Sequence, residues 1–376
     1  FFKQKTAYEI KECDWSSDVC SSDLGWISSQ RAFVKKFEKN FAAYTASSSA
    51  LAVSNGTVAI HLALAALNIG PGDEVILPDI TFAASINAVI YCGATPVLAD
   101  VDKETWTISV DEIRKLISPK TKAIMPVHLY GHPCDMDPIM QIAKEHGFLV
   151  VEDCAEALGT LYKGKHVGTF GDAGTFSFFG NKTITTGEGG MIVFRDDKVH
   201  EFATVLRDHG MSKSRRYWHE HVGFNYRLTN LQAAIGVAQL ERLDEFIQSK
   251  RNIAARYNSG LSSVEGVVLP PEKEWAFNGY WLYTFLIDQR FGVSRDELID
   301  KMMKNGVETR PLFFPLHVMP PYTKYVKEAQ KFPVSDWLSA CGISLPSSVS
   351  IEAREQDEVL NAIHAIHQTR KLNVES

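Results

Sequence analysis

A lysine beside a glycine-rich loop is the residue of this chain best suited to covalent chemistry. Lys182 follows an expected strand over residues 175–179 and precedes the run TTGEGG at residues 185–190. Glycine lets the backbone approach a ligand closely, and a lysine held in a cleft can have its pKa lowered enough to act as a nucleophile. A single lysine is more often a solvated surface residue, so this interpretation depends on the groups that accompany it.

Three such groups come before Lys182 in the chain. Gly56 and Thr57 belong to the turn SNGT, which leads into a helical run, and the backbone N–H groups at a helix start favour a phosphate. Asp153 ends an apolar strand, where ligands bind in open α/β sheets, and Ser177 lies shortly before the lysine. Each signal alone also fits an ordinary turn. In this order they are the donors, the carboxylate and the amine that pyridoxal phosphate (PLP) requires, so we predict a PLP cofactor.

Apolar runs alternate with helical patterns through the first part of the chain. Short and almost wholly apolar strands are typical of a parallel sheet covered on both faces. The expected strands are 75–78, 95–101, 123–130, 148–154, 175–179 and 191–194, and the expected helices include 58–67, one starting at Ser109, and 136–146. This alternation predicts an α/β fold with a mainly parallel sheet and helices on both of its faces.

The pattern changes in the second half. A helix is expected at Thr229, where Gln232 completes a capping box, and its apolar side is expected to hold Leu231, Ile235, Ala238 and Leu243. Later elements are a strand at 283–287, a helix capped at 294–297 and a C-terminal helix at 351–370. We therefore expect a large domain over residues 25–248 and a smaller α+β domain over residues 249–376.

The segment 1–24 differs from the rest of the chain. FFKQKTAYEIKECDWSSDVCSSDL has weak helical periodicity and lacks the features of a secretory signal. It resembles the translation of sequencing-adapter DNA that contaminates some assembled genomes. We expect it to be non-native, with a divergent N-terminus as the alternative.

The composition argues against several other classes of protein. The 376 residues carry a net charge of -6, which does not favour a nucleic-acid-binding protein. No apolar run reaches the length of a membrane span, so no membrane association is expected. The six cysteines form no CxxC pair, which predicts no metal site of that type and a reduced, cytoplasmic protein.

The segments around the candidate residues resemble one enzyme family. Over residues 25–370 the chain is similar to the DegT/DnrJ/EryC1/StrS family of PLP-dependent sugar aminotransferases, in the segments SNGTVAIHLAL, DITFAASINAV, EDCAEALG, SFFGNKTITTGEGGM and GFNYRLTNLQAAIG. The resemblance implies PLP-dependent transferase fold type I, the aspartate-aminotransferase-like fold. It implies that Lys182 carries the cofactor and that Asp153 pairs with the ring nitrogen. It also implies that Phe82 stacks on the ring, that Glu156 packs near it, and that Asn225 reaches the partner's phosphate in a homodimer with shared active sites.

Two segments point to a subgroup of that family. FFGNKTITTGEGG and RDHGMSKSRRYWHEHVGFNYR are most similar to members that aminate GDP-4-keto-6-deoxymannose with L-glutamate, which implies a nucleotide-linked keto-sugar and glutamate as partners and a role in surface polysaccharide synthesis. UDP- or dTDP-linked sugars are alternatives. Candidate substrate contacts are Arg216, Tyr217, Trp218, Arg310 and His317. A solvated charged loop and a hydrogen-bonded structural histidine are the alternatives for these residues.

Two other functions stay open for this fold. Sugar dehydratases in the same fold carry histidine in place of the cofactor lysine, so Lys182 counts against that activity. A non-catalytic dimer that kept the fold is the other alternative, which the set Lys182, Asp153 and Ser177 disfavours.

Overall fold

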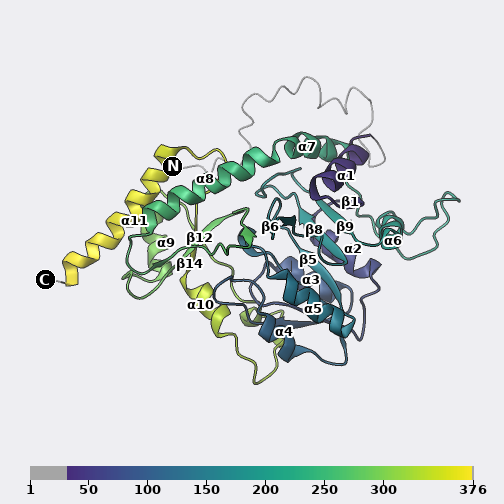
Figure 1. The fold of residues 1–376 in the computed structure, drawn as a ribbon, viewed down its shortest axis with the longest axis horizontal. Coiled ribbons are helices and arrows are strands. Elements are labelled where there is room, and N and C mark those ends of the chain that lie inside the picture. The colour runs from purple at the N-terminus through teal and green to yellow at the C-terminus, as the bar shows by residue number, and fades with distance from the viewer. Residues whose placement is uncertain (1–31, 375–376) are drawn as a thin grey trace.

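A seven-stranded sheet forms the centre of the chain (Figure 1). This computed structural model describes residues 32–374, so the segment 1–24 lies outside the described residues. The strand order is β1-β9-β8-β5-β4-β2-β3. The strands are β1 (Ala50–Val53), β2 (Glu74–Pro78), β3 (Thr95–Ala99), β4 (Thr121–Ile124), β5 (Leu149–Asp153), β8 (Ala173–Ser177) and β9 (Gly190–Phe194). The pairs from β3 to β8 are parallel, whereas β9 runs antiparallel to β8 and β1, which confirms the mainly parallel sheet.

Helices cover both faces of this sheet, as predicted. One apolar core lies between the sheet and α1 (Ala32–Thr45), α4 (Val110–Leu116), α5 (Met136–His146) and α7 (Asn230–Glu241). The other core lies between the opposite face and α2 (Gly56–Ala66), α3 (Ala83–Tyr91) and α6 (Asp197–Arg207). Among the described residues, no helix combines the length and the apolar character needed to cross a membrane.

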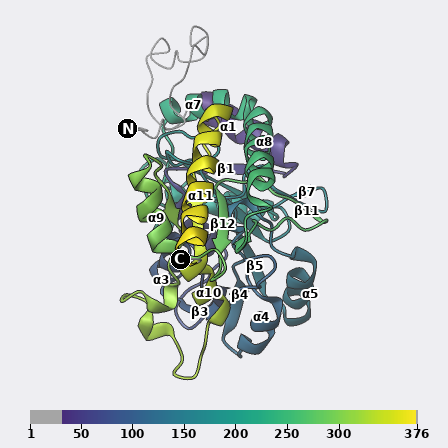
Figure 2. The ribbon, with the colours of Figure 1, turned by 90° about the vertical axis from the view of Figure 1, so that its left-hand side faces the viewer.

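The C-terminal part of the chain builds a second, antiparallel sheet. Its order is β10-β12-β14-β13, from β10 (Val267–Val268), β12 (Tyr283–Ile287), β13 (Arg310–Pro311) and β14 (Gly342–Leu345). The helices beside it are α8 (Leu243–Leu261), α9 (Arg295–Lys304), α10 (Pro333–Cys341) and α11 (Ala353–Val374). Figure 2 shows α11 between α9 and α8. Because α8 is continuous across residue 248, the domain boundary proposed there stays a prediction.

Short elements connect these two parts. A three-stranded antiparallel sheet joins β6 (Leu161–Tyr162) and β7 (Lys165–His166) to β11 (Ala276–Phe277). Three 3-10 turns are η1 (Leu129–Gly131), η2 (Leu316–Val318) and η3 (Thr323–Tyr325). The strand expected over 123–130 was wrong beyond Ile124. Pro126 has no N–H to donate to a neighbouring strand, and Tyr130 adopts a left-handed φ of 52° within η1.

The buried side of α7 also differs from the prediction. Thr229 and Gln232 form the expected capping box, but the residues that α7 buries include Ala233, Gly236, Val237 and Leu240. The side of α7 that faces α1 needs small residues for close packing, because a Cβ on Gly236 would lie 2.7 Å from the Phe37 ring on α1. Leu231 is exposed, Ile235 and Ala238 are half-buried, and Leu243 is buried at the start of α8.

Candidate active site at the carboxyl edge of the sheet

Two neighbouring parallel strands end at the same edge of the large sheet and carry candidate residues there. Asp153 is the last residue of β5 and Ser177 is the last residue of β8, and Asp153 pairs with Thr175 in the sheet register. The chain then turns, with the Lys182 N–H donating to the Phe179 carbonyl at 2.9 Å. Parallel pairing therefore brings the predicted carboxylate, hydroxyl and amine to one edge.

The turn before α2 packs directly against the end of β8. Asn55 caps the helix, because its side-chain oxygen accepts from the Val58 N–H at 3.0 Å. A Cβ on Gly56 would lie 2.7 Å from the Ser177 Cβ, so only glycine allows this approach. Gly56 and Thr57, the first two residues of α2, consequently present the helix N-terminus beside the Ser177 hydroxyl, an arrangement that suits an anion.

Asp153 is buried and held by two donors. The Ser85 hydroxyl donates to one carboxylate oxygen at 2.7 Å, and the Ala155 N–H donates to the other at 3.1 Å. Ser85 in turn lies 2.8 Å from the Thr81 hydroxyl on the same turn of chain. The sequence prediction missed Ser85, although its position three residues after Phe82 on α3 could have indicated that it faces the same site.

Phe82 precedes α3 and is 61% exposed, which leaves its ring available to stack on a planar ligand. Its nearest aromatic partner is Phe313, at 6.1 Å between ring centroids. Phe313 N–H donates to the Tyr130 hydroxyl at 3.2 Å. Neither aromatic neighbour was predicted, because both depend on contacts between segments far apart in sequence.

Glu156 and Lys182 influence each other's protonation. Burial raises the pKa of Glu156 to about 7, while Lys182 and the Tyr130 N–H, at 2.9 Å from the carboxylate, oppose that rise. Burial lowers the pKa of Lys182, and the carboxyl groups of Glu156 and Asp153 oppose that change. The lysine is thus easier to deprotonate than an exposed lysine, as nucleophilic chemistry requires.

An indole ring that the sequence prediction missed adjoins the lysine. The Lys182 Nζ lies 3.8 Å from the centroid of the Trp281 ring. A cavity of about 190 Å³ borders residues 180–183 on the side of the second sheet, and Arg310 is among its lining residues. Arg310 and the Lys182 loop therefore border the same cavity, and the role of Arg310 as a substrate contact stays a prediction.

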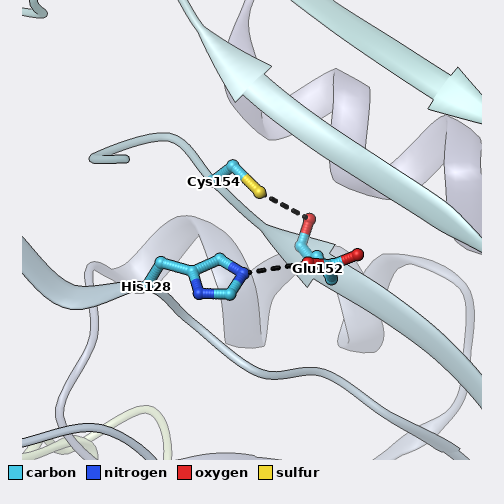
Figure 3. A group of neighbouring side chains, drawn as sticks. All are labelled: His128, Glu152 and Cys154. Atoms are coloured by element: carbon cyan, nitrogen blue, oxygen red, sulfur yellow. Dashed lines mark hydrogen bonds and ion pairs between the residues drawn. The ribbon is translucent and has the colours of Figure 1, made fainter. Parts of the chain in front are cut away.

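His128, Glu152 and Cys154 form a buried polar cluster, in which Glu152 and Cys154 flank Asp153 in the sequence (Figure 3). Their potential ligand atoms lie within 4.8 Å of one another. The Glu152 carboxylate, however, already accepts from the N–H groups of Gly168, Phe170 and Gly171 and from His128 Nε2. His128 Nδ1 accepts from the Cys134 N–H at 3.0 Å, so the donor atoms are engaged in hydrogen bonds that fix the end of β5.

Four further candidates lie on the connection between α6 and α7, whose Tyr226 carbonyl accepts from the Ser54 N–H at 2.9 Å. Asn225 is exposed, and its backbone forms an isolated antiparallel β-bridge with that of Asp208. Tyr217 and Trp218 are 76% and 51% exposed on the connection between α6 and α7, where Arg216 lies over the Tyr217 ring. Figure 1 shows this connection extending beyond α6 and away from β5 and β8.

His317 has partners at both ring nitrogens. Nδ1 lies 2.7 Å from Asp79 and Nε2 lies 3.4 Å from Asp336, and the ring stacks on Phe332. The Asp79 carboxylate also accepts from the His317 N–H at 2.8 Å. These contacts favour the structural alternative for His317, since both ring nitrogens are already engaged.

Comparisons with known proteins agree with this geometry. The DegT/DnrJ/EryC1/StrS aminotransferase family matches residues 15–364, a range that includes part of the segment set aside as non-native. GDP-perosamine synthase from Escherichia coli O157:H7 is 47% identical over 93% of this chain and 94% of its own length. The enzyme of the same name from Caulobacter vibrioides is 46% identical over 92% of each chain.

A solved structure extends the match to the fold. DesV from S. venezuelae, in complex with a ketimine intermediate, has a TM-score of 0.90 and 33% identity, and the match covers 97% of each chain. The predicted fold type I and the PLP cofactor are therefore confirmed. The chain belongs to the DegT/DnrJ/EryC1/StrS aminotransferase family and is a PLP-dependent enzyme of that family.

Proposed function

We propose that this chain transfers the amino group of L-glutamate to C4 of GDP-4-keto-6-deoxymannose and so forms GDP-perosamine for a surface polysaccharide such as an O-antigen. The observation that carries the proposal is 47% identity to GDP-perosamine synthase over nearly the full length of both chains. The site at the carboxyl edge of the sheet supports it, because its groups match the needs of the cofactor.

The fit between PLP and these residues rests on two features. Gly56 and Ser177 approach so closely that a single added carbon would fill the space, which leaves the α2 N-terminus and a hydroxyl for the phosphate. Asp153 is buried and oriented by Ser85, which suits a carboxylate that must keep a ring nitrogen protonated. When bound, PLP supplies an electron sink for the carbon from which a proton is removed.

The side chains then have distinct tasks. Lys182 would hold the cofactor and, once released by the incoming amine, would move a proton from the donor carbon to the cofactor carbon. Its pKa, lowered by burial, favours the unprotonated amine that this transfer needs. Phe82, which is exposed, would cover one face of the ring, and the buried Glu156 would lie beside it. In the second half-reaction the same lysine protonates the sugar carbon that receives the nitrogen.

A homodimer with shared active sites completes the proposal. Leu231 is 42% exposed on α7, and Ile235 and Ala238 lie on the same outward side. An apolar stripe of this kind suits burial against a second copy, and Asn225 lies just before it in the chain. In that dimer, Asn225 would contact the partner's phosphate, and Arg216, Tyr217 and Trp218 would contact the nucleotide sugar in the partner's site.

The test is an assay of the purified protein with glutamate and matched 4-keto-6-deoxy sugars linked to GDP, UDP and dTDP. We expect an aminated product from the GDP-linked sugar, detected by mass spectrometry, and none from the Lys182→Ala protein. A faster reaction with a UDP- or dTDP-linked sugar would assign another substrate. Absence of amination with all three, in protein that has bound PLP, would favour a non-catalytic dimer.

A further inference from the structure

Trp281 contacts the peptide segment that carries Lys182. Its side chain is 5% exposed, and it lies just before β12, after Tyr280, whose φ of 47° is left-handed. The indole Nε1–H donates to the carbonyl of Asn181 at 2.8 Å. The ring therefore contacts the backbone directly before Lys182, across 100 residues of sequence.

The same indole faces the amine. Lys182 Nζ lies 3.8 Å from the ring centroid, well within the range of a cation–π interaction. The carboxyl groups near this amine are Glu156 and Asp153, both buried. An ammonium group removed from water needs such partners, because burial otherwise disfavours its charge.

Further contacts fix the position of the indole. The Tyr130 ring stacks against it, with 6.0 Å between centroids and an interplanar angle of 21°. Tyr130 is itself held by its N–H bond to Glu156. On the backbone side, the buried ammonium of Lys250 donates to the Trp281 carbonyl at 3.0 Å and to the Ser347 carbonyl at 2.6 Å.

We propose that Trp281 is a positioning residue that receives the Lys182 ammonium whenever this lysine is not joined to the cofactor. In the exchange, the bond between Nζ and the cofactor carbon breaks as the donor nitrogen bonds to that carbon. The donor reacts as the free amine, so Nζ leaves as a neutral amine, and it becomes an ammonium when it takes the proton from the donor carbon. Trp281 stabilises this released form, because a lysine joined to the cofactor no longer presents a free ammonium to the ring.

The inference rests on the proposed role of Lys182, and the experiment separates the two. Borohydride reduction and peptide mapping come first, and a label on another lysine would refute the role of Lys182 itself. Dissociation constants are then measured by fluorescence for PLP, which uses the lysine, and for pyridoxamine phosphate, which leaves it free. The ratio of the two constants reports how much the free ammonium is stabilised.

Three variants define the expected results. Trp281→Leu removes the π face and should raise the constant for pyridoxamine phosphate about tenfold relative to that for PLP, as expected for a desolvated cation–π contact. Trp281→Phe keeps a π face without the N–H and should retain most of the ratio. Trp337→Leu is the matched control. It removes a ring that lies 4.9 Å from the Nζ of Lys103, a different lysine, and it should leave the ratio of the two constants unchanged.

A purely structural role for Trp281 gives a different pattern. The proposal is wrong if Trp281→Leu changes the dissociation constants for PLP and pyridoxamine phosphate by the same factor. It is also wrong if Trp281→Phe changes their ratio as much as Trp281→Leu does, because the π face would then not hold the ammonium. Where Trp281→Leu fails to fold, Trp281→Met keeps more of the side-chain volume without a π face and takes its place. Thermal unfolding of each variant shows whether it is folded.

Discussion

Glu156 should make the stability of the cofactor-free protein depend on pH near neutrality. Its pKa is about 7 in the folded chain and 4.5 in the unfolded chain, because burial disfavours the carboxylate. Between these values the folded protein keeps a proton that the unfolded chain has lost. The stabilisation is therefore complete below pH 4.5 and is lost as the pH rises through about 7. The pKa difference corresponds to about 3 kcal/mol.

Glu156→Gln isolates this effect. The glutamine oxygen can still accept from the Tyr130 N–H, which lies 2.9 Å from the glutamate oxygen, but the side chain no longer titrates. As the pH rises from 5 to 8, the stability of the variant relative to the wild-type protein should increase by about 2.5 kcal/mol, because part of the total change occurs below pH 5. The side chain is only 5% exposed, so solvent screening reduces this value little.

Urea unfolding of both proteins at several pH values gives the comparison. Glu201→Gln, at an exposed position on α6, serves as the control and should show a stability difference that does not change with pH. A difference between wild type and Glu156→Gln that stays constant from pH 5 to pH 8 would refute the reasoning. It would mean that Glu156 is already ionised in the folded protein at low pH, through pairing with Lys182.

Other changes test the cofactor site and the shared dimer. Lys182→Ala should lose the visible absorbance of bound PLP and all transamination, and borohydride should no longer fix the cofactor to the chain; retained turnover would contradict the assignment. Asp153→Asn should slow proton removal by about 10²–10³-fold in single-turnover assays, since it removes charge stabilisation in a closed site. Gly56→Ala should weaken PLP binding about tenfold in a fluorescence titration, because the new carbon would lie 2.7 Å from Ser177 Cβ. Mixing inactive Lys182→Ala and Asn225→Ala chains should restore activity if the sites are shared, whereas verified mixed dimers without activity would place Asn225 in its own subunit's site or in none.

Local signals in the sequence predicted six strands of the large sheet, but not β1, and the order of the site residues. The helix Met136–His146 and the strand Tyr283–Ile287 have the predicted bounds, because apolar periodicity and flanking residues determine them locally. The capping box of Ser294 and Glu297 is likewise a local feature, and it formed as predicted. Asp153 was found because it ends an apolar strand, and Ser177 because it lies shortly before Lys182 in the chain.

Contacts between distant segments could not be predicted in the same way. Trp281 reaches Asn181 only because the second sheet folds back toward the Lys182 loop, and no pattern around residue 281 indicates this. The inward side of α7 was wrong for a related reason. Hydrophobicity favoured Leu231, but close packing on Phe37 required the small residue Gly236. Shape complementarity between helices overrode the apolar pattern.

The position of β1 in the sheet has a consequence for synthesis of the chain. β1 pairs only with β9 within the sheet, as Ala50 opposite Val193, so β1 has no partner in the sheet until β9 has left the ribosome. At ordinary rates of translation that delay is on the order of ten seconds. During this time the turn at Gly56 also lacks Ser177 beside it, so the phosphate-binding turn cannot assemble early. Changes that delay production of residues 173–194 should therefore lengthen the exposure of an unpaired apolar strand and increase aggregation of the nascent chain.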